Sequence, residues 1–88
     1  MNKLQFSRDA MKFLEGLPTK QFRQVLLAVL ALTKDPHPHD SQPLHGYPYR
    51  RKDIGEDRVI YHLADETVIV VLIGKRNDDE VYKRLGRK

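Results

Sequence analysis

The chain has 88 residues, a length that predicts one domain with a single modest core. It contains no cysteine, which excludes disulfides and thiolate metal sites, and it has no apolar run long enough to span a membrane. A net charge of +4 favours a polyanionic partner such as RNA, DNA or an acidic protein. We expect a cytoplasmic protein, because neither disulfides nor an N-terminal signal segment can be recognised.

The first part of the chain predicts a short strand followed by a helical hairpin. Residues 3–6 alternate with period two, as a strand does. Ser7 can cap a first helix, which Gly16 and Pro18 end, and Thr19 can cap a second helix. The apolar face of the first helix consists of Ala10, Phe13, Leu14 and Leu17. The apolar face of the second consists of Phe22, Val25, Leu26, Val29 and Leu30.

The rest of the chain predicts strands joined by short turns. Residues 35–40 contain two prolines and no large apolar side chain, which indicates a loop. We expect strands over residues 47–52, 58–63 and 67–73, the last of which is an unbroken apolar run typical of a central strand. Residues 79–85 form either a short helix or a loose end.

This order of elements predicts an α+β fold. We expect a small antiparallel sheet of about four strands, with the two N-terminal helices packed on one of its faces. The sequence shows no repeat and no boundary, so a single domain covers residues 1–88. The other face of the sheet would then be open to carry the function.

A basic cluster accompanies the predicted sheet. Arg50 and Lys52 are two residues apart on one strand and share a face, whereas Arg51 points to the other side. Arg58 begins the next strand after a short turn, so we expect it close to Lys52 across the hairpin. If the strands start and stop together, Arg58 and Arg76 come within reach of one bound phosphate.

Such a cluster suits metal-free cleavage of RNA. This reaction needs a base for the ribose 2′-OH, cations for the charge that builds on the phosphate, and an acid for the leaving 5′-oxygen. Lys52 is the predicted base, because neighbouring cations disfavour its charged form, although Arg50 and Arg51 remain open for this role. No paired carboxylates suggest a metal site, so we expect neither a metal nor another cofactor.

Three further side chains complete the candidate site. Arg58 and Arg76 suit bidentate phosphate binding, and Tyr82 offers a ring for base stacking and a hydroxyl for proton transfer. The alternative for Tyr82 is that its ring simply packs under a C-terminal helix. The remaining candidates for RNA binding are Arg50, Arg51 and Lys75.

Three short motifs resemble the RelE branch of the RelE/ParE toxin superfamily. Gly-Lys-Arg at 74–76, followed by Val-Tyr at 81–82, resembles its closing motif after an apolar strand. Arg-Val-Ile-Tyr at 58–61 resembles a characteristic strand, and Leu-His-Gly at 44–46 resembles the turn before the first basic strand. The resemblance covers nearly the whole chain, with its specific motifs in the second half.

This resemblance implies a toxin of a type II toxin–antitoxin system, with two helices on a small antiparallel sheet. It implies metal-independent endoribonuclease activity on mRNA, carried out on the ribosome. It also implies a cognate antitoxin as partner, through which the complex would bind operator DNA, and no association with membranes.

The resemblance also assigns roles to residues. Arg76 would assist the leaving group, Arg58 would stabilise the transition state, and Tyr82 would pack on a base and orient the substrate. Arg50 and Lys52 match the basic strand residues, with Lys52 as general base.

Two other functions remain open. The first is a ParE-like inhibitor of DNA gyrase on the same fold, which would not need this set of basic residues and tyrosine. The second is an inactive module that binds nucleic acid or an antitoxin. Its support is Asp53, which stands where many relatives carry a basic residue.

Overall fold

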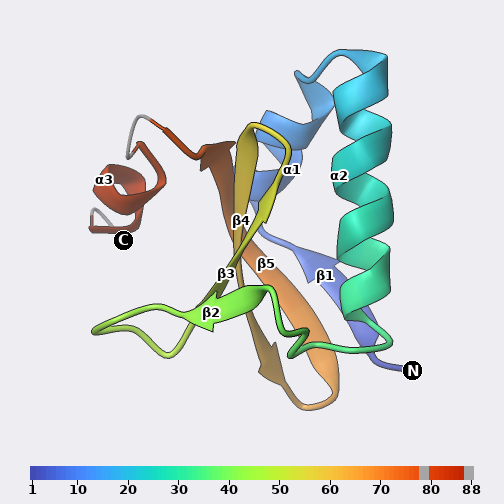
Figure 1. Cartoon of the computed structure of the whole chain (residues 1–88), viewed down its shortest axis with the longest axis vertical. Coiled ribbons are helices and arrows are strands. Elements are labelled where there is room, and N and C mark those ends of the chain that lie inside the picture. The colour runs from blue at the N-terminus through green and yellow to red at the C-terminus, as the bar shows by residue number, and fades with distance from the viewer. Residues whose placement is uncertain (78–79, 87–88) are drawn as a thin grey trace.

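A five-stranded mixed sheet lies between helices on both faces (Figure 1). The computed structural model describes residues 1–77 and 80–86. The strand order is β1-β5-β4-β3-β2, with β1 parallel to β5 and all other neighbours antiparallel. In chain order the elements are β1 (Lys3–Phe6), α1 (Arg8–Glu15), α2 (Thr19–Leu32), β2 (Ser41–Pro43), β3 (Arg50–Ile54), β4 (Asp57–Ala64), β5 (Thr67–Lys75) and α3 (Glu80–Gly86).

The helical hairpin α1–α2 covers one face of the sheet, as the sequence predicts. Ser7 caps α1, because its Oγ accepts a hydrogen bond from the backbone N of Ala10 at 3.0 Å. The expected cap of α2 is wrong: Pro18 takes the capping position without a side-chain bond, and Thr19 is already helical. None of the described helices has the length and apolar composition to cross a membrane.

The main core lies between this hairpin and the sheet. Tyr61 is fully buried there, and its hydroxyl donates a hydrogen bond to the backbone oxygen of Pro36 at 2.7 Å. This bond ties β4 to the loop over residues 35–40, which the sequence correctly predicts. The buried members of the core are Ala10, Leu14, Val25, Val29, Leu32, Ile54, Val59, Tyr61, Val68, Val70 and Ile73.

A second cluster lies on the opposite face, where α3 packs against the sheet (Figure 1). The expectation that this face is open is therefore only half right, since α3 covers part of it. The described part of the predicted segment 79–85 is helical, while Asp79 lies outside the described residues. The buried members of this cluster are Leu44, Ile60, Leu72, Val81 and Leu85.

The sheet contains one strand that the sequence does not predict. β2 has three residues, of which Gln42 and Pro43 are exposed, so no alternating apolar pattern marks it. The predicted strand 47–52 begins at Arg50 and extends to Ile54. It turns into β4 through two residues, the first of which, Gly55, has a φ of 59°. The antiparallel order β3-β4-β5 is confirmed.

Candidate active site

The register between β3 and β4 determines which basic side chains meet. Asp53 pairs with Arg58, and Lys52 pairs with Val59. Cross-strand partners share a face and successive residues alternate, so Arg51, Asp53 and Arg58 lie on the face that α3 covers. Lys52 lies with Val59 on the face of α1 and α2.

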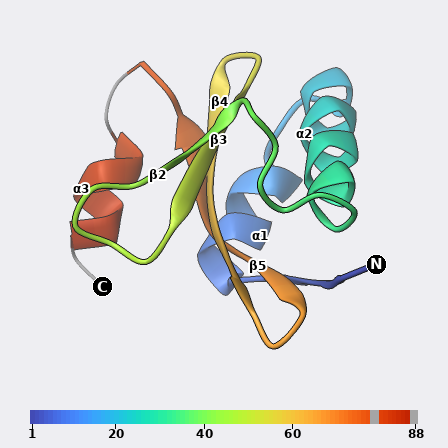
Figure 2. The same ribbon diagram turned by 60° about the horizontal axis from the view of Figure 1, so that its bottom comes forward.

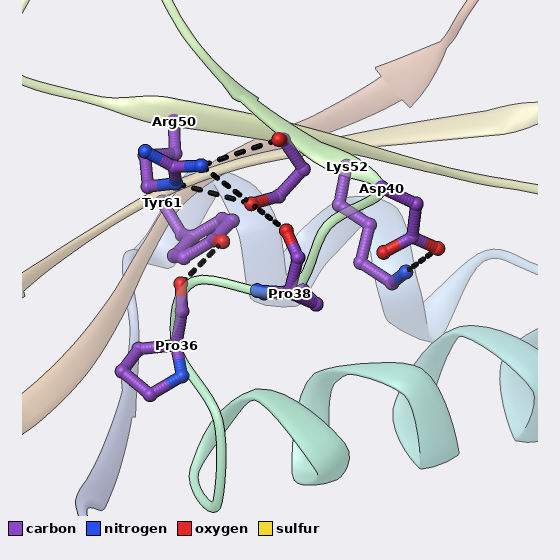
Figure 3. Close-up of polar contacts among 7 residues, drawn as sticks. Pro36, Pro38, Asp40, Arg50, Lys52 and Tyr61 are labelled. Atoms are coloured by element: carbon purple, nitrogen blue, oxygen red, sulfur yellow. Dashed lines mark hydrogen bonds and ion pairs between the residues drawn. The ribbon is translucent and has the colours of Figure 1, made fainter.

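Arg50 and Lys52 therefore point away from the expected site, toward the side of the sheet where α2 lies (Figure 3). Arg50 Nη2 donates to Ser41 Oγ at 2.9 Å, and Lys52 Nζ lies 2.6 Å from Asp40 Oδ2. The hydrogen bond from Lys52 holds the pKa of the Asp40 carboxyl below its ordinary value. The expectation that Lys52 lies beside Arg58 is wrong, because a shift of one residue in strand register moves a side chain to the opposite face.

Arg58 is the centre of the cluster on the α3 face. Its side chain is 11% exposed, and its Nε and Nη2 donate to the two carboxylate oxygens of Asp53 at 2.6 and 3.1 Å. Its Nη1 donates to Tyr82 Oη at 2.6 Å. The bond to Arg58 holds the pKa of Asp53 below its ordinary value, and Asp53 in turn raises the pKa of Arg58.

Arg51 and Arg76 lie on two sides of Arg58, and these three arginines, together with Tyr82, form a guanidinium cluster. Arg51 Nη1 lies 3.4 Å from Tyr82 Oη, and its Nη2 donates to Gln42 Oε1 at 2.7 Å. Arg76 Nη1 lies 3.9 Å from Asp53 Oδ2, and the Arg76 side chain is 52% exposed. Arg58 and Arg76 thus converge on one carboxylate, where two guanidinium groups could hold one phosphate.

Lys75, an expected RNA contact, does not join this cluster. It pairs with Asp57 across β4 and β5, one residue beyond the pair of Gly74 and Arg58, so it belongs to the other face of the sheet. Asp57 is 2% exposed, and burial raises the pKa of its carboxyl.

The position of Tyr82 depends on the close approach of α3 to β5. A Cβ atom on Gly74 would lie 2.7 Å from Val81 Cγ1, so only glycine allows this packing. Arg84 fastens the helix further, because it donates to the backbone oxygen of Ile73 at 3.1 Å and forms an ion pair with Asp9 on α1. Gly74 in the Gly-Lys-Arg motif therefore serves to bring the Tyr82 hydroxyl to Arg58.

Two members of the cluster are not assigned a role by sequence reasoning. Asp53 stands out only as a departure from the family pattern, and Gln42 lies on the unpredicted strand β2. Gly55 is the signal that identifies the role of Asp53. A two-residue turn beginning at Gly55 places Asp53 opposite Arg58, whereas a longer turn would change the register. No group of three or more His, Cys, Asp or Glu side chains that could hold a metal occurs within residues 1–77 and 80–86.

Comparison with known proteins agrees with this fold. Residues 4–80 match the family described as the ParE toxin of type II toxin–antitoxin systems, parDE. The chain belongs to the RelE/ParE superfamily of type II toxins. No curated protein matches the sequence.

Several solved structures share the fold. A free-state mutant of the E. coli toxin RelE has a TM-score of 0.81 at 23% identity, covering 98% of this chain and 95% of that one. The RelE–RelB complex from Pyrococcus horikoshii OT3 gives 0.77 at 24% identity, covering 88% and 97%. The intact E. coli RelBE toxin–antitoxin complex gives 0.76 at 21% identity, covering 88% and 99%.

Proposed function

We propose that this toxin is a metal-independent endoribonuclease that cleaves mRNA. The observation that carries the proposal is the convergence of Arg51, Arg58 and Arg76 with the Tyr82 hydroxyl on one face of the sheet. Three guanidinium groups can stabilise the negative charge of a phosphorane-like transition state, and hydrogen bonding to Arg58 and Arg51 holds the tyrosine in place.

The contact of Arg58 with Asp53 supports a binding place for the scissile phosphate at this position. The Asp53 carboxylate engages the Nε and Nη2 edge of Arg58, the same edge that binds phosphate oxygens in pairs. Asp53 therefore competes with the phosphate for Arg58, and its ion pair with Arg58 breaks when RNA binds. The 2′-oxygen then attacks the adjacent phosphorus, and its proton passes to a non-bridging phosphate oxygen. The bond to the 5′-oxygen breaks, and that oxygen takes the proton of the Tyr82 hydroxyl, which the phosphate proton then replaces. The products are a 2′,3′-cyclic phosphate and a 5′-hydroxyl end. DNA lacks the 2′-OH and is not cut.

Proton transfer falls to the groups on this face. The Tyr82 hydroxyl can both donate and accept a proton, and it already accepts from Arg58, so its own hydrogen is available to the phosphate or the leaving oxygen. Arg51 occupies the place beside the phosphate that Lys52 was expected to fill. Arg76, the most exposed of the three arginines, closes the site from the end of β5.

The relatives of known structure support a protein partner, since several of them are complexes of RelE with RelB. We propose a cognate antitoxin that covers this toxin and, through its own DNA-binding part, brings the complex to operator DNA. We propose mRNA on the ribosome, in the cytoplasm, as the substrate. The net charge of +4 suits both an RNA and an acidic antitoxin.

The test is a short induction of the toxin followed by five-prime end mapping of a translated message. We expect growth arrest and new ends carrying a 5′-hydroxyl. Arg58→Ala should abolish these ends, while Leu63→Ala, an exposed position near the far end of β4, should leave them unchanged. Intact messages in arrested cells would overturn the proposal.

A second candidate function is favoured by the family description itself, which names ParE. A gyrase inhibitor on this fold would arrest growth through trapped gyrase cleavage complexes and DNA damage, with messages intact. The same induction therefore separates the two functions, if DNA breaks are measured beside the message ends.

A further inference from the structure

Three aromatic rings form a row beside the guanidinium cluster. Tyr47 and Tyr49 stack with ring centroids 6.0 Å apart and planes inclined by 10°, and the Tyr49 centroid lies 5.2 Å from that of His62. Tyr49 is half-buried against the apolar cluster under α3, whereas Tyr47, at the end of the row, is 42% exposed. The row thus has two half-buried rings, Tyr49 and His62, and an exposed terminal ring, Tyr47.

A tight turn holds the exposed ring in this position. The backbone N of Tyr47 donates to the oxygen of Leu44 at 3.2 Å, and Gly46 has a φ of 84°. This combination is that of a type II β-turn, which requires glycine at its third position. The backbone N of Leu44 donates to the oxygen of Tyr49 at 2.9 Å and closes the loop. Tyr47 is therefore presented by a short, hydrogen-bonded loop.

This loop and α3 enclose a pocket of about 370 Å³. Tyr47 and Leu44 form part of its wall, and Arg51 and Tyr82 of the guanidinium cluster form another part. Figure 2 shows the connection between β2 and β3 passing beside α3. The pocket and the cluster are therefore continuous, since two residues belong to both.

We propose that this pocket is a subsite for an unpaired nucleobase, adjacent to the phosphate bound at the cluster. The inference rests on the proposed function, since it is the bound phosphate that brings a base to the pocket. An exposed tyrosine ring at the end of a stack accepts a further flat ring, and Gln42 and His45, which also line the pocket, provide polar groups for the edge of the base. The pocket favours single-stranded RNA, because a paired base must first unpair and unstack, which costs a few kcal/mol.

The test uses a short single-stranded RNA, made uncleavable by 2′-O-methyl groups, with one 2-aminopurine flanked by uridines. Fluorescence of 2-aminopurine falls when the base stacks, so we expect quenching on binding to the unmodified toxin. Tyr47→Ala should abolish most of the quenching and weaken binding by about 5- to 100-fold, with an unchanged dependence of affinity on salt. Tyr47→Phe should keep both quenching and affinity, because the ring is retained.

The controls separate stacking from phosphate binding. Arg58→Ala should weaken binding with a shallower salt dependence, and Leu63→Ala should behave like the unmodified toxin. Quenching and affinity that survive Tyr47→Ala would overturn the subsite, whatever the outcome for message cleavage. If instead messages remain intact while Tyr47→Ala abolishes quenching, the subsite stands and the proposed catalytic function falls.

Discussion

Asp53 is an acidic residue within a site that otherwise suits phosphate binding. It places a negative charge between Arg58 and Arg76, with its carboxylate oxygens 2.6 and 3.9 Å from their nearest guanidinium nitrogens. Without it, Arg58 would be a largely buried cation with no anionic partner. Asp53 thus stabilises the resting protein and opposes substrate binding at the same time.

Replacing Asp53 should therefore have opposite effects on stability and on RNA binding. Asp53→Asn should tighten binding of uncleavable RNA by about fivefold, since removing one like charge near a phosphate is worth about 1 kcal/mol. The melting temperature at pH 7 should fall, because Arg58 loses its ion pair. RNA titrations and thermal melts of both proteins measure the two effects.

The loss of stability in Asp53→Asn should depend on pH. Arg58 holds the pKa of Asp53 below its ordinary value of 3.8, so the carboxylate contributes stability above that pH and loses it as the pH falls through the lowered pKa. The gap in melting temperature between the two proteins should thus be full at pH 6, begin to narrow near pH 4 and close as the pH falls past the lowered pKa. A gap independent of pH would show that the charge of Asp53 is not what stabilises the fold.

Asp57 presents the reverse case at the start of β4. Its Oδ1 is buried and has no hydrogen-bond partner, and burial raises the pKa of the carboxyl. The penalty is full above the raised pKa and disappears as the pH falls below the ordinary value. Asp57→Asn should stabilise the protein at pH 7 by about 1 kcal/mol, or about 4–8 °C in melting temperature, and less at pH 4. Glu15→Gln, an exposed change on α1, should shift the melting temperature far less.

The site is complete only when α3 packs against β5. This helix contributes Tyr82 to the cluster and Val81 to the apolar contact with β5, and both depend on the absence of a side chain at Gly74. The Gly-Lys-Arg and Val-Tyr motifs thus mark a packing contact as well as a chemical site.

Gly74→Ala should reduce RNA cleavage while the fold survives. Its Cβ would lie 2.7 Å from Val81 Cγ1, so α3 must shift and Tyr82 moves away from Arg58. A displacement of about 1 Å can cost about a hundredfold in rate. Gly86→Ala is the matched control, since nothing lies within 4 Å of a Cβ there. Cleavage rates of the two variants, with circular dichroism to check folding, measure the effect. Equal rates would contradict the role given to α3.

The sequence predicts the elements better than their pairing. Periodic apolar residues predict the helical hairpin and the three-stranded meander, and Ser7 predicts the start of α1. The sequence does not predict β2, because Ser41–Pro43 is short, contains proline and buries only one residue. The sequence also does not predict the contact of α3 with the sheet, because no local pattern shows that Gly74 is buried beneath Val81.

The two faces of the sheet have different roles in the whole molecule. One face packs on α1 and α2 and holds the main core, and the other carries both the smaller apolar cluster and the guanidinium cluster. The types of residue in the site are predictable from the sequence, but their distribution between the faces is not. This distribution depends on the register of the hairpin β3–β4, in which the consecutive residues Arg51 and Lys52 lie on opposite faces.

The placement of Arg51 and Lys52 on opposite faces can be tested directly. Arg51→Ala and Lys52→Ala change neighbouring cations on opposite faces of β3, so each variant controls for the charge lost in the other. Five-prime ends of a translated message should be mapped after brief induction of each variant. We expect Arg51→Ala to lose the toxin-dependent ends and Lys52→Ala to keep them. Loss of the ends with Lys52→Ala and their survival with Arg51→Ala would contradict the assignment of catalysis to the α3 face.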